Sequence, residues 1–84
     1  MKTIVRKDNN ISLYLFEDSV YVEIGADKTI IGNPATLYID DCNTENSLLI
    51  ENVTNPQDWR GWKYFYIDNK WSLNPDWIDP FPQV

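Results

Sequence analysis

All four tryptophans of the chain lie between residues 59 and 77, in a segment where aromatic and polar side chains alternate. Alternation of this kind is typical of β-strands that bury one face. Asp68 and Asn69 interrupt the pattern, and both residue types tolerate the left-handed backbone that a tight hairpin turn requires. The sequence therefore predicts a hairpin of residues 62–67 and 70–73, which forms either part of the core or a recognition surface.

A domain of this size needs large apolar groups in its core, so at least part of the aromatic segment must be buried. We predict that Trp62 and Trp71 are core residues. Tyr64, Tyr66 and Trp77 are predicted to be exposed and to form a contact surface for sugars or proteins.

The rest of the chain also carries the pattern of strands. No stretch of a dozen residues repeats apolar side chains at helical spacing. We therefore expect an all-β fold, a small antiparallel sandwich or barrel of about six to seven short strands. Residues 11–16 and 20–24 are joined by a short turn and are expected to pair as a hairpin. The predicted strands outside the aromatic hairpin are 2–7, 11–16, 20–24, 28–31, 35–40 and 47–51.

With 84 residues the chain has material for one core, so we expect a single domain, 1–84, with its β-core in residues 1–73. Residues 74–84 hold three of the five prolines and cannot form a central strand. Their composition predicts an extended C-terminal arm rich in Pro and Trp, in which Trp77, Ile78 and Phe81 are the apolar contact residues. We expect this arm to mediate self-association or docking. The alternative is that it packs back on its own domain.

The charge of the chain limits the classes of partner that it can bind, and its cysteine content indicates the cellular compartment. The net charge is −6 and the few basic residues are scattered, which disfavours nucleic acid and anionic membranes as partners. A single cysteine, Cys42, cannot form an internal disulfide, and the N-terminus lacks the apolar run of a signal peptide. We therefore expect a protein made in the cytoplasm and not secreted.

Catalysis finds little support in the composition, because the chain has no histidine to act as a general acid or base. Cys42 consequently has no histidine partner for a thiolate pair. We predict no enzyme activity, no catalytic residue and no cofactor. The acid pairs Asp76 with Asp79 and Asp40 with Asp41 are interpreted as ordinary turn and surface residues.

The segment 41–46 places oxygen-bearing side chains at loop positions 1, 3 and 5, as a calcium loop does. Asn46 then stands where glycine is needed, and Asn52 where a bidentate glutamate is needed. We predict no metal site. A solvated loop whose Asp or Asn side chains cap backbone amides is favoured over a weak calcium site.

Several stretches together resemble small uncharacterised proteins of tailed bacteriophages, notably marine phages of cyanobacteria. The stretches are 11–18, 40–43, 53–64 and 71–77, and from the first to the last they span most of the chain. The resemblance implies a phage origin and a product made in the host cytoplasm, and it carries no catalytic or ligand signature. Many such small β-proteins resemble virion components of the tail, the fibre or the capsid surface, so the resemblance implies a role of that kind.

These observations favour a non-enzymatic phage protein that is virion-associated or assists assembly, and that acts through protein contacts or as a homo-oligomer. A carbohydrate-binding module that uses exposed aromatics for host-surface attachment is the alternative. A third hypothesis is a small acidic inhibitor of a host protein. The predicted interaction surface consists of Tyr64, Tyr66, Trp77, Ile78 and Phe81.

Overall fold

The computed structural model describes residues 1–78, which form eight short strands and, in that range, no helix. Every pairing between the strands is antiparallel. The predicted small antiparallel β fold is confirmed. The strands are β1 (Lys2–Arg6), β2 (Ser12–Phe16), β3 (Val22–Ile24), β4 (Thr29–Ile31), β5 (Leu37–Ile39), β6 (Ser47–Ile50), β7 (Tyr64–Ile67) and β8 (Lys70–Leu73).

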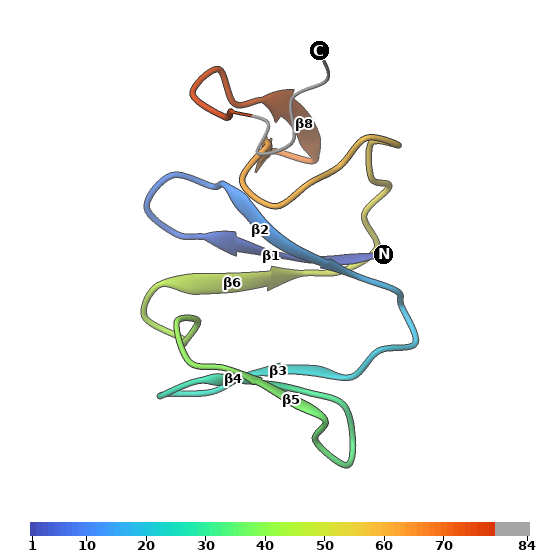
Figure 1. The fold of residues 1–84 in the computed structure, drawn as a ribbon, viewed down its shortest axis with the longest axis vertical. Coiled ribbons are helices and arrows are strands. Elements are labelled where there is room, and N and C mark those ends of the chain that lie inside the picture. Colours follow the sequence, from blue (N-terminus) through green and yellow to red (C-terminus); the bar gives the residue numbers. More distant parts are fainter. Residues whose placement is uncertain (79–84) are drawn as a thin grey trace.

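The strands form three small sheets, which Figure 1 shows one above another. We call β2-β1-β6 the central sheet, β3-β4-β5 the outer sheet and β7-β8 the terminal hairpin. The central sheet lies between the other two in Figure 1. The chain leaves it after β2, builds the outer sheet and then returns as β6.

The predicted hairpin of residues 11–16 and 20–24 is wrong. β2 pairs with β1, with Ile4 opposite Tyr14, whereas β3 pairs with β4. A turn does form between the two segments, where the Val20 amide donates to the Glu17 carbonyl, but it leads the chain into a different sheet. Alternation specifies which face of a strand is buried and does not specify which strand lies beside it.

Strand β1 is buried on both faces, and this gives the domain two hydrophobic clusters. Consecutive side chains on a strand point to opposite faces, so Ile4 and Val5 belong to different clusters. Ile4 packs toward the outer sheet, and Val5 packs toward the terminal hairpin. The first cluster consists of Ile4, Val22, Ile31, Ile39 and Cys42. The second consists of Val5, Val53 and Tyr66.

A short chain of hydrogen bonds attaches Trp59 to the central sheet. The Thr3 hydroxyl donates to the Tyr14 carbonyl at 2.8 Å, so the Ser12 hydroxyl must donate to Thr3 Oγ1 across 2.6 Å. Ser12 Oγ in turn accepts from the Trp59 indole at 2.9 Å. Thr3 and Ser12 are completely buried. Because each hydroxyl both donates and accepts, none of these groups is left unsatisfied in the interior.

The terminal hairpin turns at the predicted residues. Asp68 and Asn69 have φ of 52° and 65°, the left-handed pair that joins two strands with their natural twist. Across the hairpin Tyr66 is opposite Trp71, and their ring centres are 4.6 Å apart. The Tyr66 amide donates to the Asn10 carbonyl, which attaches the hairpin to the start of β2.

Candidate functional site

The structure does not bring the predicted interaction residues together on one exposed surface. Tyr66 is only 8% exposed and packs in the second hydrophobic cluster, so its prediction as a surface residue is wrong. Tyr64 and Trp77 are half-buried, and Ile78 is 84% exposed. Phe81 lies outside the described residues. The aromatic face of the hairpin is turned inward because Val5 and Val53 supply the apolar surface that covers it.

Tyr64 and Trp77 take part in a local cluster around Asp58. The Tyr64 hydroxyl donates to Asp58 Oδ1 at 2.6 Å, and Lys63 Nζ lies 2.8 Å from Asp58 Oδ2. These two hydrogen bonds hold the pKa of Asp58 below its usual value, and the bond to Asp58 raises the pKa of Tyr64. Lys63 Nζ also lies 4.9 Å from the centre of the Trp77 ring. The cluster therefore ties the chain around Trp77 to its own domain.

The first residues of the predicted arm form a turn and are not extended. Asn74 is buried, its side-chain oxygen accepts from the Asp76 amide, and its carbonyl accepts from the Trp77 amide. Pro75 occupies the second turn position, which its fixed φ favours. Asn74 Nδ2 also donates to the Trp62 carbonyl at 3.0 Å. The arm thus begins by folding back on the domain, and residues 79–84 lie outside the described part.

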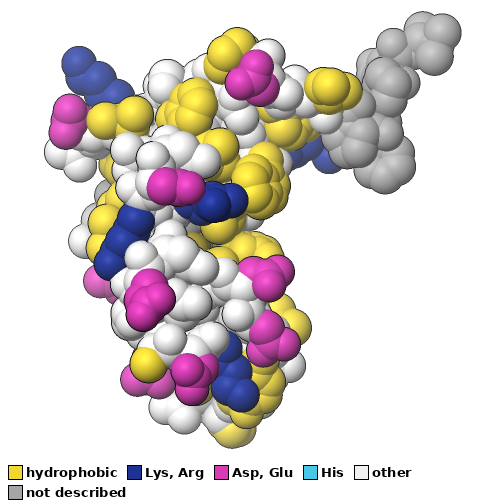
Figure 2. All heavy atoms as spheres, turned by 90° about the vertical axis from the view of Figure 1, so that its left-hand side faces the viewer, with side chains coloured by type: hydrophobic (Ala, Val, Ile, Leu, Met, Phe, Trp, Pro, Cys, Tyr) yellow, Lys and Arg dark blue, Asp and Glu magenta, His cyan; other side chains and the backbone are white. Residues whose placement is uncertain are grey.

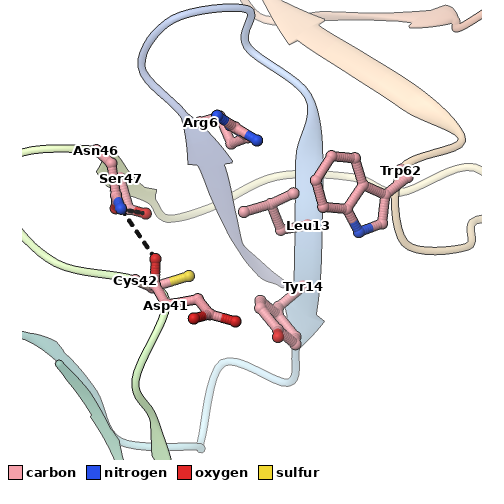
Figure 3. Close-up of a pocket in the computed structure, with 8 residues that line it drawn as sticks. All are labelled: Arg6, Leu13, Tyr14, Asp41, Cys42, Asn46, Ser47 and Trp62. Atoms are coloured by element: carbon pink, nitrogen blue, oxygen red, sulfur yellow. Dashed lines mark hydrogen bonds between the residues drawn. The ribbon is translucent and has the colours of Figure 1, made fainter.

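A groove of about 320 Å³ opens between the central sheet, the loop that precedes β6 and Trp62 (Figure 3). This volume lies near the lower end of the range found for ligand pockets in proteins. In Figure 1 the end of β1 and the start of β6 lie on the left, and Figure 2 looks onto that side. Hydrophobic, basic and acidic side chains lie next to one another there. The groove is lined by Arg6, Leu13, Tyr14, Asp41, Cys42, Asn46, Ser47 and Trp62.

Trp62 forms one wall of the groove and is 49% exposed, so its prediction as a core residue is wrong. Its backbone has φ of 72°, a conformation that costs on the order of 1–3 kcal/mol for a residue other than glycine. Two hydrogen bonds hold it there, from the Trp62 amide to the Ser12 carbonyl and from Asn74 Nδ2 to the Trp62 carbonyl. Gly61 allows the backbone before Trp62 to lie close to β2, because a Cβ at Gly61 would lie 3.0 Å from the Leu13 carbonyl oxygen.

Arg6, the last residue of β1, lies beside the indole. Its guanidinium carbon is 5.8 Å from the centre of the Trp62 ring. Two hydrogen bonds join the same guanidinium to Asp8, at 3.1 Å from Nε to Oδ1 and 3.0 Å from Nη2 to Oδ2. This fork arrangement fixes the plane of the guanidinium. Arg6 and Trp62 therefore present a preformed polar and aromatic wall.

The opposite wall is the loop of residues 41–46. Asn43 Oδ1 accepts from the amides of Glu45 and Asn46, and Asn46 Oδ1 accepts from the Asn43 amide. These bonds confirm the interpretation of the loop as one that caps its own backbone. Among the described residues, no group of three or more acidic or thiol side chains is placed to hold a metal ion. Asp41, at the start of the loop, lines the groove with its carboxylate on the side of Tyr14 in Figure 3.

Tyr14, which is partly exposed, and the buried Cys42 complete the lining. Burial is the main cause that raises the pKa of the Tyr14 hydroxyl, and the nearby Cys42 and Asp41 raise it further. Cys42 is 1% exposed and belongs to the first hydrophobic cluster. The thiol thus contributes packing to the groove, and Tyr14 contributes a neutral hydroxyl and a ring face.

The groove combines an exposed indole, a phenol, a guanidinium and a carboxylate. Such a set can bind a ligand that has apolar faces and several hydroxyl or amino groups. Among the lining residues, patterns in the sequence pointed to Trp62, Asp41, Cys42 and Asn46, but no pattern pointed to Arg6 or Tyr14. Only strand pairing brings these two residues to the groove, since Ile4 lies opposite both Tyr14 and Leu49 and Arg6 lies opposite Ser47.

In comparisons with known proteins, no family model, curated protein or solved structure matches the chain. In the described part of the chain, no helix is long and apolar enough to cross a membrane.

Proposed function

We propose that this protein is a small binding module that recognises a saccharide in the groove beside Trp62, without catalysing a reaction. The observation that carries the proposal is the half-exposed indole, which is held in a left-handed backbone conformation at the wall of a polar groove. Strained backbone conformations persist where the surrounding structure enforces them, and they gather at binding sites.

Saccharides match this lining better than purely apolar ligands do. A pyranose ring has an apolar face of C–H groups that covers an aromatic ring, and its hydroxyl groups both donate and accept hydrogen bonds. In the groove the Asp41 carboxylate accepts, the Arg6 guanidinium donates and the Tyr14 hydroxyl can do either. An apolar ligand would leave these polar groups unpaired, at a cost in affinity.

The substitution Trp62→Ala tests this function. We expect it to lower the affinity for the recognised saccharide by about tenfold or more, because truncation of a central aromatic side chain removes a large contact area. A glycan array identifies the ligand, and isothermal titration calorimetry gives the affinities.

Trp77→Ala is the matched control, because Trp77 is also a half-buried tryptophan but does not line the groove. It is expected to keep the affinity of the parent protein. Equal losses of saccharide affinity in the two variants would contradict the assignment of the site to the groove. If the parent protein binds no saccharide, the proposed function is refuted.

Contacts between protein chains are a second candidate function, in keeping with the virion or assembly role that the phage resemblance implies. Strand β5 is an edge strand of the outer sheet, and its Leu37 and Tyr38 side chains are each 54% exposed. An edge with free backbone groups and apolar side chains favours pairing with the same edge of a second copy.

Under this candidate function the parent protein is expected to form a dimer in light scattering, and Tyr38→Arg is expected to convert it to a monomer. Tyr21→Arg is the control, since Tyr21 is 44% exposed but lies outside β5. A parent protein that stays monomeric at every concentration would exclude this self-association.

A further inference from the structure

The charges in the groove are unequal. The bidentate pair with Asp8 compensates most of the positive charge of Arg6. The Asp41 carboxylate forms no salt bridge or side-chain hydrogen bond with any other described residue. The net charge of the whole chain is also negative, at −6. The groove therefore has an excess of negative charge at the Asp41 wall.

Aromatic rings strengthen the preference for a positive group. Tyr14 and Trp62 line the same groove as Asp41 (Figure 3), and the faces of such rings attract cations. The charge of Asp41 already acts within the groove, because it contributes to the raised pKa of Tyr14. The Trp62 ring already has the Arg6 guanidinium over it, so the Tyr14 ring is the one that remains for a ligand cation. An ammonium group near Asp41 and Tyr14 gains both ion pairing and cation–π attraction.

We infer that the groove selects a saccharide with a free amino group, such as a glucosamine oligosaccharide, whose ammonium lies beside Asp41 while a sugar ring covers Trp62. This inference rests on the proposed saccharide function and specifies its ligand. A uronic acid would place its carboxylate near that of Asp41 and would be repelled. An N-acetylated sugar keeps the ring but loses the positive charge.

The experiment compares three disaccharides by isothermal titration calorimetry, at a pH where the amine is protonated. They are the glucosamine disaccharide, its N-acetylated form and a disaccharide that contains glucuronic acid. The parent protein is expected to bind the glucosamine disaccharide at least tenfold more tightly than the N-acetylated one, and the glucuronic acid compound most weakly. Asp41→Asn is expected to remove the preference for the amine, so that the glucosamine disaccharide and its N-acetylated form bind to the variant with similar affinities.

Asp40→Asn is the matched control, because Asp40 is the adjacent exposed acid and does not line the groove. Asp40→Asn removes one negative charge, as Asp41→Asn does, and is expected to keep the preference for the amine. If Asp40→Asn reduces the preference as much as Asp41→Asn, the selectivity comes from the overall charge and the inference is overturned.

The two proposals fail in different ways. Equal affinities of the parent protein for the amino and N-acetylated sugars overturn the amine inference and leave the saccharide function standing. No binding of any of the three sugars, nor of any sugar on the glycan array, overturns both.

Discussion

Ile4→Ala is expected to lower the free energy of unfolding by about 2–5 kcal/mol, which is a large share of the roughly 5–15 kcal/mol typical of a single domain. Ile4 has no exposed surface and lies in the cluster that joins the central sheet to the outer sheet. The truncation leaves a cavity that the short surrounding strands cannot fill. Chemical denaturation, monitored by circular dichroism, measures the decrease in the free energy of unfolding.

Leu48→Ala provides the comparison for this substitution. Leu48 also lies in the central sheet, where it is opposite Val5, but its side chain is 49% exposed. A surface truncation of this kind is expected to change the free energy of unfolding by no more than about 0.5 kcal/mol. Similar denaturation midpoints for the two variants would show that Ile4 does not hold the two sheets together.

Tyr66→Ala is expected to lower the free energy of unfolding by about 3–5 kcal/mol, because the ring fills the second cluster between Val5 and Trp71. Trp62→Ala is expected to cost only about 0.5–1 kcal/mol, the value of an exposed contact between Arg6 and an indole. Thermal melting of the two variants measures the difference. The opposite order of melting temperatures would mean that the hairpin packs through Trp62, with Tyr66 at the surface.

The terminal hairpin shows how far the sequence predicts local structure. The alternation in residues 62–67 and 70–73 predicted both strands, although the first begins at Tyr64 and not at Trp62. The turn chemistry of Asp68 and Asn69 predicted the left-handed turn. Strand alternation and turn preference both depend on residues that are close together in the sequence. The direction in which each face points depends on distant segments, and here Val53 and Val5 cover the face of Tyr66.

Trp62 illustrates why the groove could not be predicted. Strand alternation would place Trp62 on the same face as Tyr64 and Tyr66, but its φ of 72° interrupts the strand and turns the indole toward the groove. The cause is a pair of hydrogen bonds with Ser12 and Asn74, residues far away in the sequence. Arg6 and Tyr14 reach the same groove through the strand order of the central sheet, which no local pattern specifies.

The burial of β1 on both faces has a consequence for the order of events during synthesis. β1 leaves the ribosome before the other described strands, yet its partner β6 begins only at Ser47 and the aromatic ring that covers Val5 follows at Tyr66. At about 5–20 residues per second, the apolar first strand waits on the order of seconds for the chain that will enclose it. The first cluster needs the chain only as far as Cys42, whereas the second needs it as far as Tyr66, so Val5 stays uncovered until the later half of the chain has been made.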